Sequence, residues 1–91
     1  MFIEHGGEVR KFMVYRDLDE TGVFKLFEDY ILIGEFNTSY TNIGLFVSYT
    51  IDLPDFIPLP EEIIEQIWDH TETCFLKDNV YTGIVFKIFS N

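Results

Sequence analysis

Hydrophobic and polar residues alternate early in the chain in the way that is typical of a β-strand. Residues 8–16, E-V-R-K-F-M-V-Y-R, place Phe12 and Val14 on one side of an extended backbone and Met13 and Tyr15 on the other. Alternation with period two among β-branched and aromatic residues predicts a strand.

Further strands are predicted where similar apolar runs lie between polar or glycine-containing segments. Residues 30–37 and 43–51 are two such runs, and the polar residues 38–42 between them predict an antiparallel hairpin with a longer loop. Residues 80–89 predict the last strand. Residues 1–7, which end in two glycines, predict a short lead-in or an edge strand.

Two structures fit residues 17–29, and the pattern favours a helix. In a helix, Asp17 or Asp19 would accept hydrogen bonds from the free N–H groups of the first turn. Four apolar residues then fall at helical spacing: Val23, Leu26, Phe27 and Tyr30. In the alternative hairpin, residues 19–22 form the turn and residues 23–33 the second strand. Gly22 disfavours the helix by about 1 kcal/mol relative to alanine.

A second helix is predicted from Pro60 to about Leu76. Residues 52–60 hold all three prolines of the chain and predict a stiff, extended connection. Pro60 suits the first helical position because its missing N–H would have no partner there. Residues 77–79 predict a turn.

The resulting order, β-α-β-β-α-β, predicts one α+β domain over residues 1–91. The favoured fold is ferredoxin-like, with a four-stranded, mostly antiparallel sheet and two helices on one face. If residues 17–29 form a hairpin, the alternative is a four-stranded meander with one packed helix.

The second helix has two distinct faces. At 100° per residue, one arc about 100° wide holds five acids, here called the acidic stripe: Glu61, Glu62, Glu65, Asp69 and Glu72. The opposite arc holds the predicted core residues: Ile63, Ile64, Ile67, Trp68, Cys74 and Phe75. The helix dipole favours acids in the first turn but not in the last, and no lysine on the helix relieves the repulsion between acids four residues apart.

Composition and charge indicate a folded, strongly acidic protein. The chain is 47% hydrophobic, enough to form a core, yet 16 acids and 6 bases leave a net charge of −10. Such a surface repels phosphate backbones and anionic membranes, so neither nucleic acid nor membrane is an expected direct partner. It attracts basic proteins. Further acids predict a second row beside the acidic stripe: Asp17, Asp19, Glu20, Glu28 and Asp29.

The candidate catalytic and metal-binding residues do not assemble into a site. His70 and Cys74 lie four residues apart, but Cys74 is predicted to be a buried, inert thiol beside Ile67. Only His5 remains as a third soft ligand, whereas structural zinc takes four. We therefore expect no enzyme, metal or cofactor.

The remaining features predict location and contacts. A single cysteine fits a reducing compartment. The chain begins without the pattern of a signal peptide and has no apolar run of bilayer-spanning length, so a cytoplasmic protein is expected. Tyr40 and Phe56 are predicted to protrude as an apolar interface, and the apolar runs at 31–33 and 84–86 suggest a homodimer.

In size, charge and lack of catalytic groups, the chain resembles the small acidic inhibitors that bacteriophages use against host restriction or CRISPR nucleases. Several proteins of that class mimic DNA with ordered carboxylates. The acidic stripe and the second row carry the resemblance, which implies that the chain blocks the basic cleft of a nuclease. A toxin-neutralising immunity protein fits the same logic. The other alternative is a structural or dimerising module whose charge confers only solubility.

Overall fold

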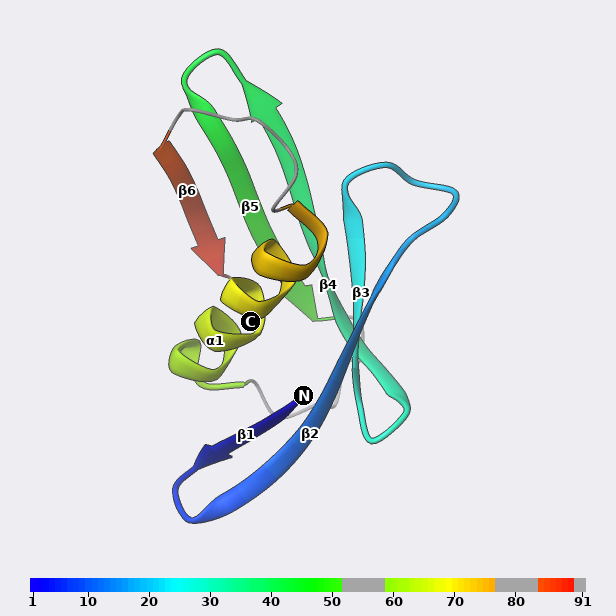
Figure 1. Ribbon diagram of the computed structural model, residues 1–91, viewed down its shortest axis with the longest axis vertical. Helices are drawn as coiled ribbons and strands as arrows, with labels where there is room; N and C mark the ends of the chain where they lie inside the picture. The colour runs from blue at the N-terminus through cyan, green and yellow to red at the C-terminus, as the bar shows by residue number, and fades with distance from the viewer. Residues whose placement is uncertain (52–58, 77–83, 90–91) are drawn as a thin grey trace.

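Six strands form a single mixed sheet in the computed structural model, which describes residues 1–51, 59–76 and 84–89 (Figure 1). The strands lie in chain order: β1 (Phe2–His5), β2 (Glu8–Arg16), β3 (Val23–Glu28), β4 (Ile31–Thr41), β5 (Gly44–Ile51) and β6 (Ile84–Phe89). The first five form an antiparallel meander, and β6 pairs with β5 in parallel. Between them lie α1 (Glu61–Thr71) and one π-helical turn, η1 (Glu72–Leu76).

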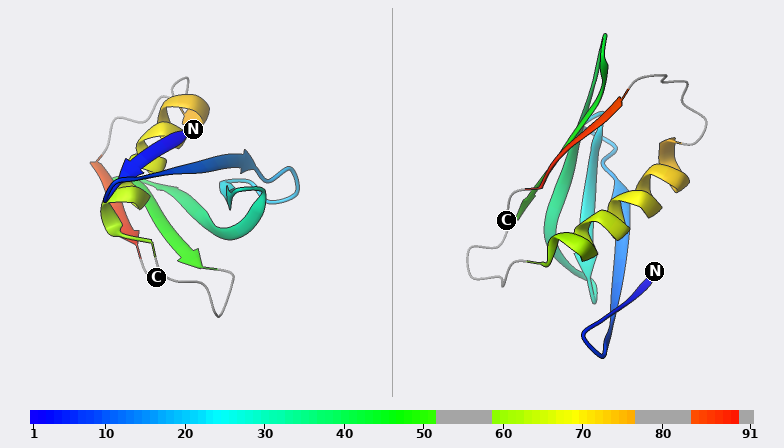
Figure 2. Two further views of the ribbon diagram at one scale, coloured as in Figure 1. Left: turned by 90° about the horizontal axis from the view of Figure 1, so that it is seen from below. Right: turned by 90° about the vertical axis from the view of Figure 1, so that its left-hand side faces the viewer.

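The sheet curls around the helix. Figure 2 shows α1 running across the concave face, with β1 and β6 at the two edges of the sheet. Both edge strands reach the helix through side chains: His5 of β1 contacts Glu62, and Lys87 of β6 contacts Glu65. The curl therefore places a single helix between the two ends of the sheet.

The helix predicted for residues 17–29 is wrong, because this segment is a turn followed by β3. One carboxylate oxygen of Asp17 accepts hydrogen bonds from the N–H groups of Asp19 (2.9 Å) and Glu20 (3.3 Å). An N-cap would make the same kind of bond, but here it stabilises a local turn. The Asp17 N–H then donates to the Val23 carbonyl and closes the hairpin. Pairing with both β2 and β4 decides in favour of the strand.

The two turns that flank β4 both differ from the prediction. β3 and β4 are joined by Asp29 and Tyr30, which have positive φ angles of 48° and 69°. At its other end β4 continues to Thr41 rather than giving way to a loop at 38–42, because these residues still pair with β5. The short turn is held by the Thr41 hydroxyl, which accepts the N–H of Gly44 (3.2 Å).

The helix lies close to its predicted position. Pro60 precedes α1 as the N-cap rather than as its first residue, and its carbonyl accepts the N–H groups of Ile63 and Ile64. Helical structure ends at Leu76, as predicted, but the last turn is π-helical. Near this change of geometry, the hydroxyls of Thr71 and Thr73 donate to carbonyls four residues earlier. The predicted connection at 52–58 and the turn at 77–79 lie outside the described residues.

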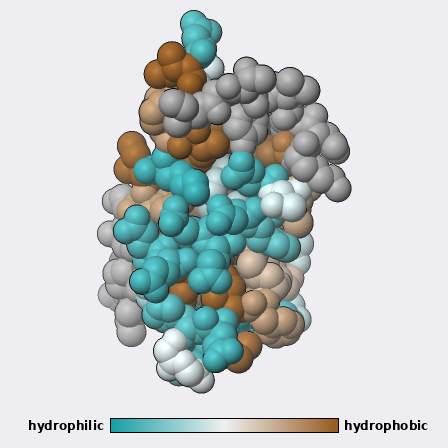
Figure 3. Space-filling model, turned by 60° about the vertical axis from the view of Figure 1, so that its left-hand side comes forward, coloured by the Kyte–Doolittle hydropathy of each residue, from teal (hydrophilic) through white to brown (hydrophobic). Residues whose placement is uncertain are grey.

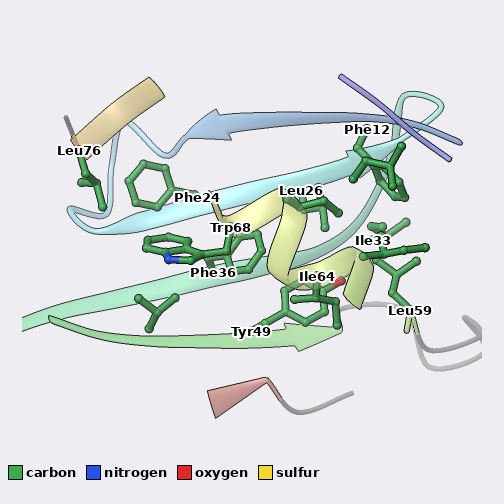
Figure 4. Packing of buried hydrophobic residues seen from close by; sticks show 14 of the residues in the cluster. Phe12, Phe24, Leu26, Ile33, Phe36, Tyr49, Leu59, Ile64, Trp68 and Leu76 are labelled. Atoms are coloured by element: carbon green, nitrogen blue, oxygen red, sulfur yellow. The ribbon is translucent and has the colours of Figure 1, made fainter. Parts of the chain in front are cut away.

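The core lies between the concave face of the sheet and α1 (Figure 4). Phe36 occupies its centre, with ring centroids 5.1 Å from Tyr49 and 5.5 Å from Trp68. Inward positions on alternate residues of the strands supply one half, and α1 with its flanking residues supplies the other. The buried residues in this cluster are Ile3, Phe12, Phe24, Leu26, Ile33, Phe36, Leu45, Val47, Tyr49, Leu59, Ile63, Ile64, Ile67, Trp68 and Leu76.

The predicted fold class is therefore wrong. The protein is mostly β, with a six-stranded, mixed, curled sheet and one short helix, and it does not have the ferredoxin-like order. The four-stranded meander with one helix also fails. It omits β1, treats residues 23–33 as one strand across the turn between β3 and β4, and does not foresee the parallel pairing of β6. Two segments account for the difference from the favoured fold: residues 17–29 contain a turn and β3 in place of a helix, and residues 2–5 form an edge strand.

Candidate functional site

The acidic stripe lies on the outer face of α1. Side chains of Glu62, Glu65 and Asp69 are 78%, 50% and 67% exposed, and Glu61 is also exposed. Glu72, the first residue of η1, is half-buried. Figure 3 shows a broad hydrophilic area on the side of the molecule where α1 lies. Four carboxylates thus reach solvent from three consecutive turns of helix.

The position of these carboxylates is set by the opposite face of α1. Ile63, Ile64, Ile67 and Trp68 are fully buried against the sheet, as the spacing predicts. A helix anchored by four core side chains cannot rotate about its axis, so its outer face is preorganised.

Lys87 of β6 compensates part of the acidic stripe. Its ammonium lies 3.3 Å from a Glu65 carboxylate oxygen and 3.5 Å from one of Asp69. Partial burial of Lys87 acts to lower its pKa, but the hydrogen bond to Glu65 and the nearby charges outweigh it, so the pKa is raised above its ordinary value. The sequence shows no lysine on the helix itself. Only the parallel pairing of β6 with β5 brings this cation to the helix.

The first turn of α1 has a contact of its own. His5 Nε2 lies 3.1 Å from a carboxylate oxygen of Glu62. This contact joins the edge strand β1 to the first turn of α1.

The second row of acids is not assembled. Asp17, Asp19 and Glu20 lie in the β2–β3 turn, whereas Glu28 and Asp29 lie at the other end of β3. Glu28 is also engaged, because Arg10 donates two hydrogen bonds to its carboxylate, of 2.6 and 2.7 Å. The hydrogen bond to Glu28 raises the pKa of Arg10. The structure therefore separates these five acids into two groups.

The predicted apolar interface is described only in part. Tyr40 is 51% exposed, but it lies within β4 and not in a turn. It lines a cavity at the end of the concave face. Phe56 lies outside the described residues.

Cys74 is exposed, in contrast to the buried thiol predicted for the apolar arc. The π-helical turn explains the difference, because its wider repeat rotates the residues of η1 away from the positions of an α-helix. The thiol sulfur lies 3.5 Å from His70 Nε2. Among the described residues no group of three or more His, Cys, Asp or Glu side chains is placed to hold a metal ion.

A second candidate surface, which the sequence pattern did not reveal, lies on the outer face of the sheet. Phe46 of β5 and Phe86 of β6 stack there, with ring centroids 4.6 Å apart, and Ile88 is 64% exposed. A shallow hollow of about 160 Å³ adjoins them, between β4, β5 and β6. The contact between the two rings depends on the register of the parallel pair, which places Phe46 opposite Phe86.

Comparisons with protein-family models, with curated proteins and with solved structures find no match for this chain. Within the described part of the chain, no helix has the length and apolar character needed to cross a membrane.

Proposed function

We propose that this chain is a non-enzymatic inhibitor that covers the basic, nucleic-acid-binding surface of a partner protein, such as a restriction or CRISPR-type nuclease, in the cytoplasm. The acidic stripe is the proposed contact surface. Its carboxylates take the place of nucleic-acid phosphates in the basic cleft, and no reaction is involved.

The observation that supports this proposal is the rigid exposure of four carboxylates on one helical face. Glu61, Glu65 and Asp69 follow one another at about 6 Å along the axis. Because the opposite face of α1 is held in the core, ordering these side chains for binding costs less than on a mobile segment. The net charge of −10 adds a long-range attraction to basic surfaces.

Lys87 makes the proposal more specific. A basic partner must compete with this lysine for Glu65 and Asp69, whereas Glu61 makes no ion pair with any described residue. Removing the lysine should therefore strengthen binding, because the partner gains two carboxylates without displacing an internal cation.

The test is a comparison of variants in retention of a partner. The immobilised protein is exposed to an extract of its host cells, bound protein is eluted with a salt gradient, and duplex DNA is tested as a competitor. The affinity for the retained partner is then measured with purified protein. The double variant Glu65→Gln, Asp69→Asn should weaken this affinity about fivefold or more at low salt. Lys87→Met should tighten it.

A matched control is the Glu4→Gln, Glu8→Gln variant, which removes the same number of charges from the β1–β2 hairpin. This control should change binding much less than the stripe variant. Equal effects of the two double variants would attribute binding to overall charge. Retention that resists both salt and DNA would contradict the mimicry of nucleic acid.

A structural or dimerising module remains a second candidate, and the outer face of the sheet supports it. Phe46 of β5 forms an apolar area with Phe86 and Ile88 of the edge strand β6. If the chain assembles through this face, Ile88→Lys should shift the mass measured by light scattering to that of the monomer. Stripe variants should leave that mass unchanged. A monomeric wild-type protein would contradict a homodimer.

A further inference from the structure

A cavity of about 420 Å³ opens on the concave face of the sheet, beyond the C-terminal end of the helical segment. Its volume lies in the range of small-molecule sites. Phe24 and Leu76 form its apolar floor, at the end of the core that lies away from Phe12 in Figure 4. The polar lining includes Arg16, Asp17, Thr21 and Tyr40.

Arg16 lines this cavity with an exposed side chain that three contacts position. Its Nη2 donates a hydrogen bond of 3.0 Å to the Phe75 carbonyl, and its guanidinium lies over the rings of Phe24 and Phe75, at 5.8 and 5.6 Å. The other N–H donors of this guanidinium have no partner among the described residues. A fixed guanidinium with unused donors is suited to binding a carboxylate.

Two of the five lysine and arginine residues in the described part of the chain, Arg16 and Lys11, form no ion pair, and Lys11 instead donates a hydrogen bond to the Tyr30 hydroxyl. Arg10, Lys25 and Lys87 each pair with one or more carboxylates. Arg16 pairs with none in the described part of the chain, although Asp17 is the next residue and lines the same cavity. Two opposite charges therefore face one space without neutralising each other.

Asp17 is fixed as firmly as Arg16. One of its carboxylate oxygens accepts the N–H groups of Asp19 and Glu20, and the other makes no hydrogen bond to a described residue. With Asp19 and Glu20 exposed nearby, the mouth of the cavity repels a ligand with net negative charge. A ligand must bring a cation along with its carboxylate.

The wall between the turn and β4 is built before any ligand arrives. Thr38 donates hydrogen bonds from its N–H and from its hydroxyl to the Gly22 carbonyl, both of 2.8 Å. Gly22 has φ of +82°, and a Cβ there would lie 2.9 Å from Thr38 oxygens. The wall requires glycine, and binding requires little rearrangement.

We propose that this cavity binds a zwitterionic amino acid with an apolar side chain. Arg16 receives the carboxylate, Asp17 receives the ammonium group, and Phe24 and Leu76 contact the apolar side chain. The site is separate from the acidic stripe, so it tests independently of the inhibitor function.

The experiment is an NMR titration of the full chain, following backbone amides around the cavity. The probes are L-phenylalanine and L-leucine, together with 3-phenylpropionate, which lacks the amine, phenethylamine, which lacks the carboxylate, and inorganic phosphate. We expect saturable shifts at Leu18, Thr21 and Gly22 with the two amino acids at millimolar concentration. The other three probes should bind more weakly.

Three variants and one control separate binding from folding. Arg16→Gln should weaken binding about tenfold or more. Thr21→Tyr keeps the charges of Arg16 and Asp17 but fills the mouth of the cavity, so it should also abolish binding. This variant tests the site even if Arg16→Gln does not fold. Asp17→Asn can still accept the turn hydrogen bonds, and it should shift preference from L-phenylalanine to 3-phenylpropionate. Lys11→Gln is the control, since it removes one charge from the other face of β2.

Several results would overturn the proposal. No saturable shift with either amino acid would remove the site. Equal binding of phosphate or 3-phenylpropionate by the wild-type protein would make it a general anion site. Unchanged binding by Thr21→Tyr would place the ligand elsewhere.

Discussion

Both faces of the sheet carry aromatic side chains but hold them in different ways. On the concave face, Phe36 is fully buried between Tyr49 and the equally buried Trp68 of α1, which also contacts Phe24. On the outer face, Tyr15 meets Phe27 at 5.5 Å and Phe46 stacks on Phe86, each ring with one aromatic partner described. No described helix covers that face. The concave face therefore supplies the stability, and the outer face is open to contacts.

Charges divide between the faces in a related way. Lys25 and Glu35 form a cross-strand pair at 2.7 Å on the outer face, where each neutralises the other. On the helix that covers the concave face, one lysine serves two carboxylates of the acidic stripe. The Lys25–Glu35 pair thus leaves no net charge at its place on the outer face, whereas the helix keeps an excess of negative charge.

The largest expected effect comes from removing the central aromatic of the helix. Trp68→Ala deletes a fully buried side chain that packs against Phe24 and Phe36, and it should lower the free energy of unfolding by about 3–5 kcal/mol. Urea denaturation followed by circular dichroism measures this. The matched change on the outer face, Phe27→Ala, should cost about 1 kcal/mol. Equal losses of unfolding free energy in the two variants would mean that both faces of the sheet contribute equally to stability.

A smaller effect is expected from adding a methyl group to the concave face. A Cβ at Gly34 would lie 2.6 Å from Tyr49 Oη and would also overlap the Thr50 carbonyl. Gly34→Ala should therefore lower the free energy of unfolding by about 1–3 kcal/mol.

A second substitution tests this explanation by removing the Tyr49 hydroxyl while leaving the contact with the Thr50 carbonyl in place. Combining Gly34→Ala with Tyr49→Phe should recover part of the loss, as a double-mutant cycle in urea measures. Ser48→Ala, on the outer face of the same strand as Tyr49, should stay within about 0.5 kcal/mol of wild type. No recovery in the double variant would assign the strain to the two contacts that remain, with the Thr50 carbonyl and with the ring carbon Cζ at position 49.

The smallest effect concerns the ion pairs of Lys87. Their partners are half or more exposed, so Lys87→Met should cost about 0–1 kcal/mol at neutral pH and less in high salt. The folded state raises the pKa of Lys87 above 10.5. Its stabilising contribution is therefore full below that pH and is lost as the pH rises through the folded pKa.

Denaturation of wild type and Lys87→Met across alkaline pH tests this sign. The difference in free energy of unfolding should stay constant from neutral pH to about 10 and shrink above it. A difference that grows with pH would contradict the raised pKa.

Much of the local structure follows from the pattern of residues. The strands at 8–16 and 43–51 and the helix ending at Leu76 lie where alternation and helical spacing predict them. The buried and exposed faces of α1 were also predicted up to Thr71. Beyond it the prediction failed for Cys74, because a π-helical turn depends on local geometry that an ideal wheel does not contain.

The candidate surfaces can be predicted from the sequence only where all their residues lie on a single helix or strand. The acidic stripe is a property of one helix, and its exposure follows from the burial of the other face. The cavity at Arg16 and the apolar pair Phe46–Phe86 join segments distant in the chain, so no local pattern reveals them.

By itself, the sequence determined which residues alternate, which face of the helix is apolar, and how much negative charge the surface carries. The tertiary structure alone decided that residues 23–28 form a strand, since the hydrogen bonds of Asp17 fit a helix start and a turn alike. It also decided that Lys87 meets Glu65 across 22 residues of chain. The physical reason is that pairing between distant strands supplies free energy that local preferences do not contain.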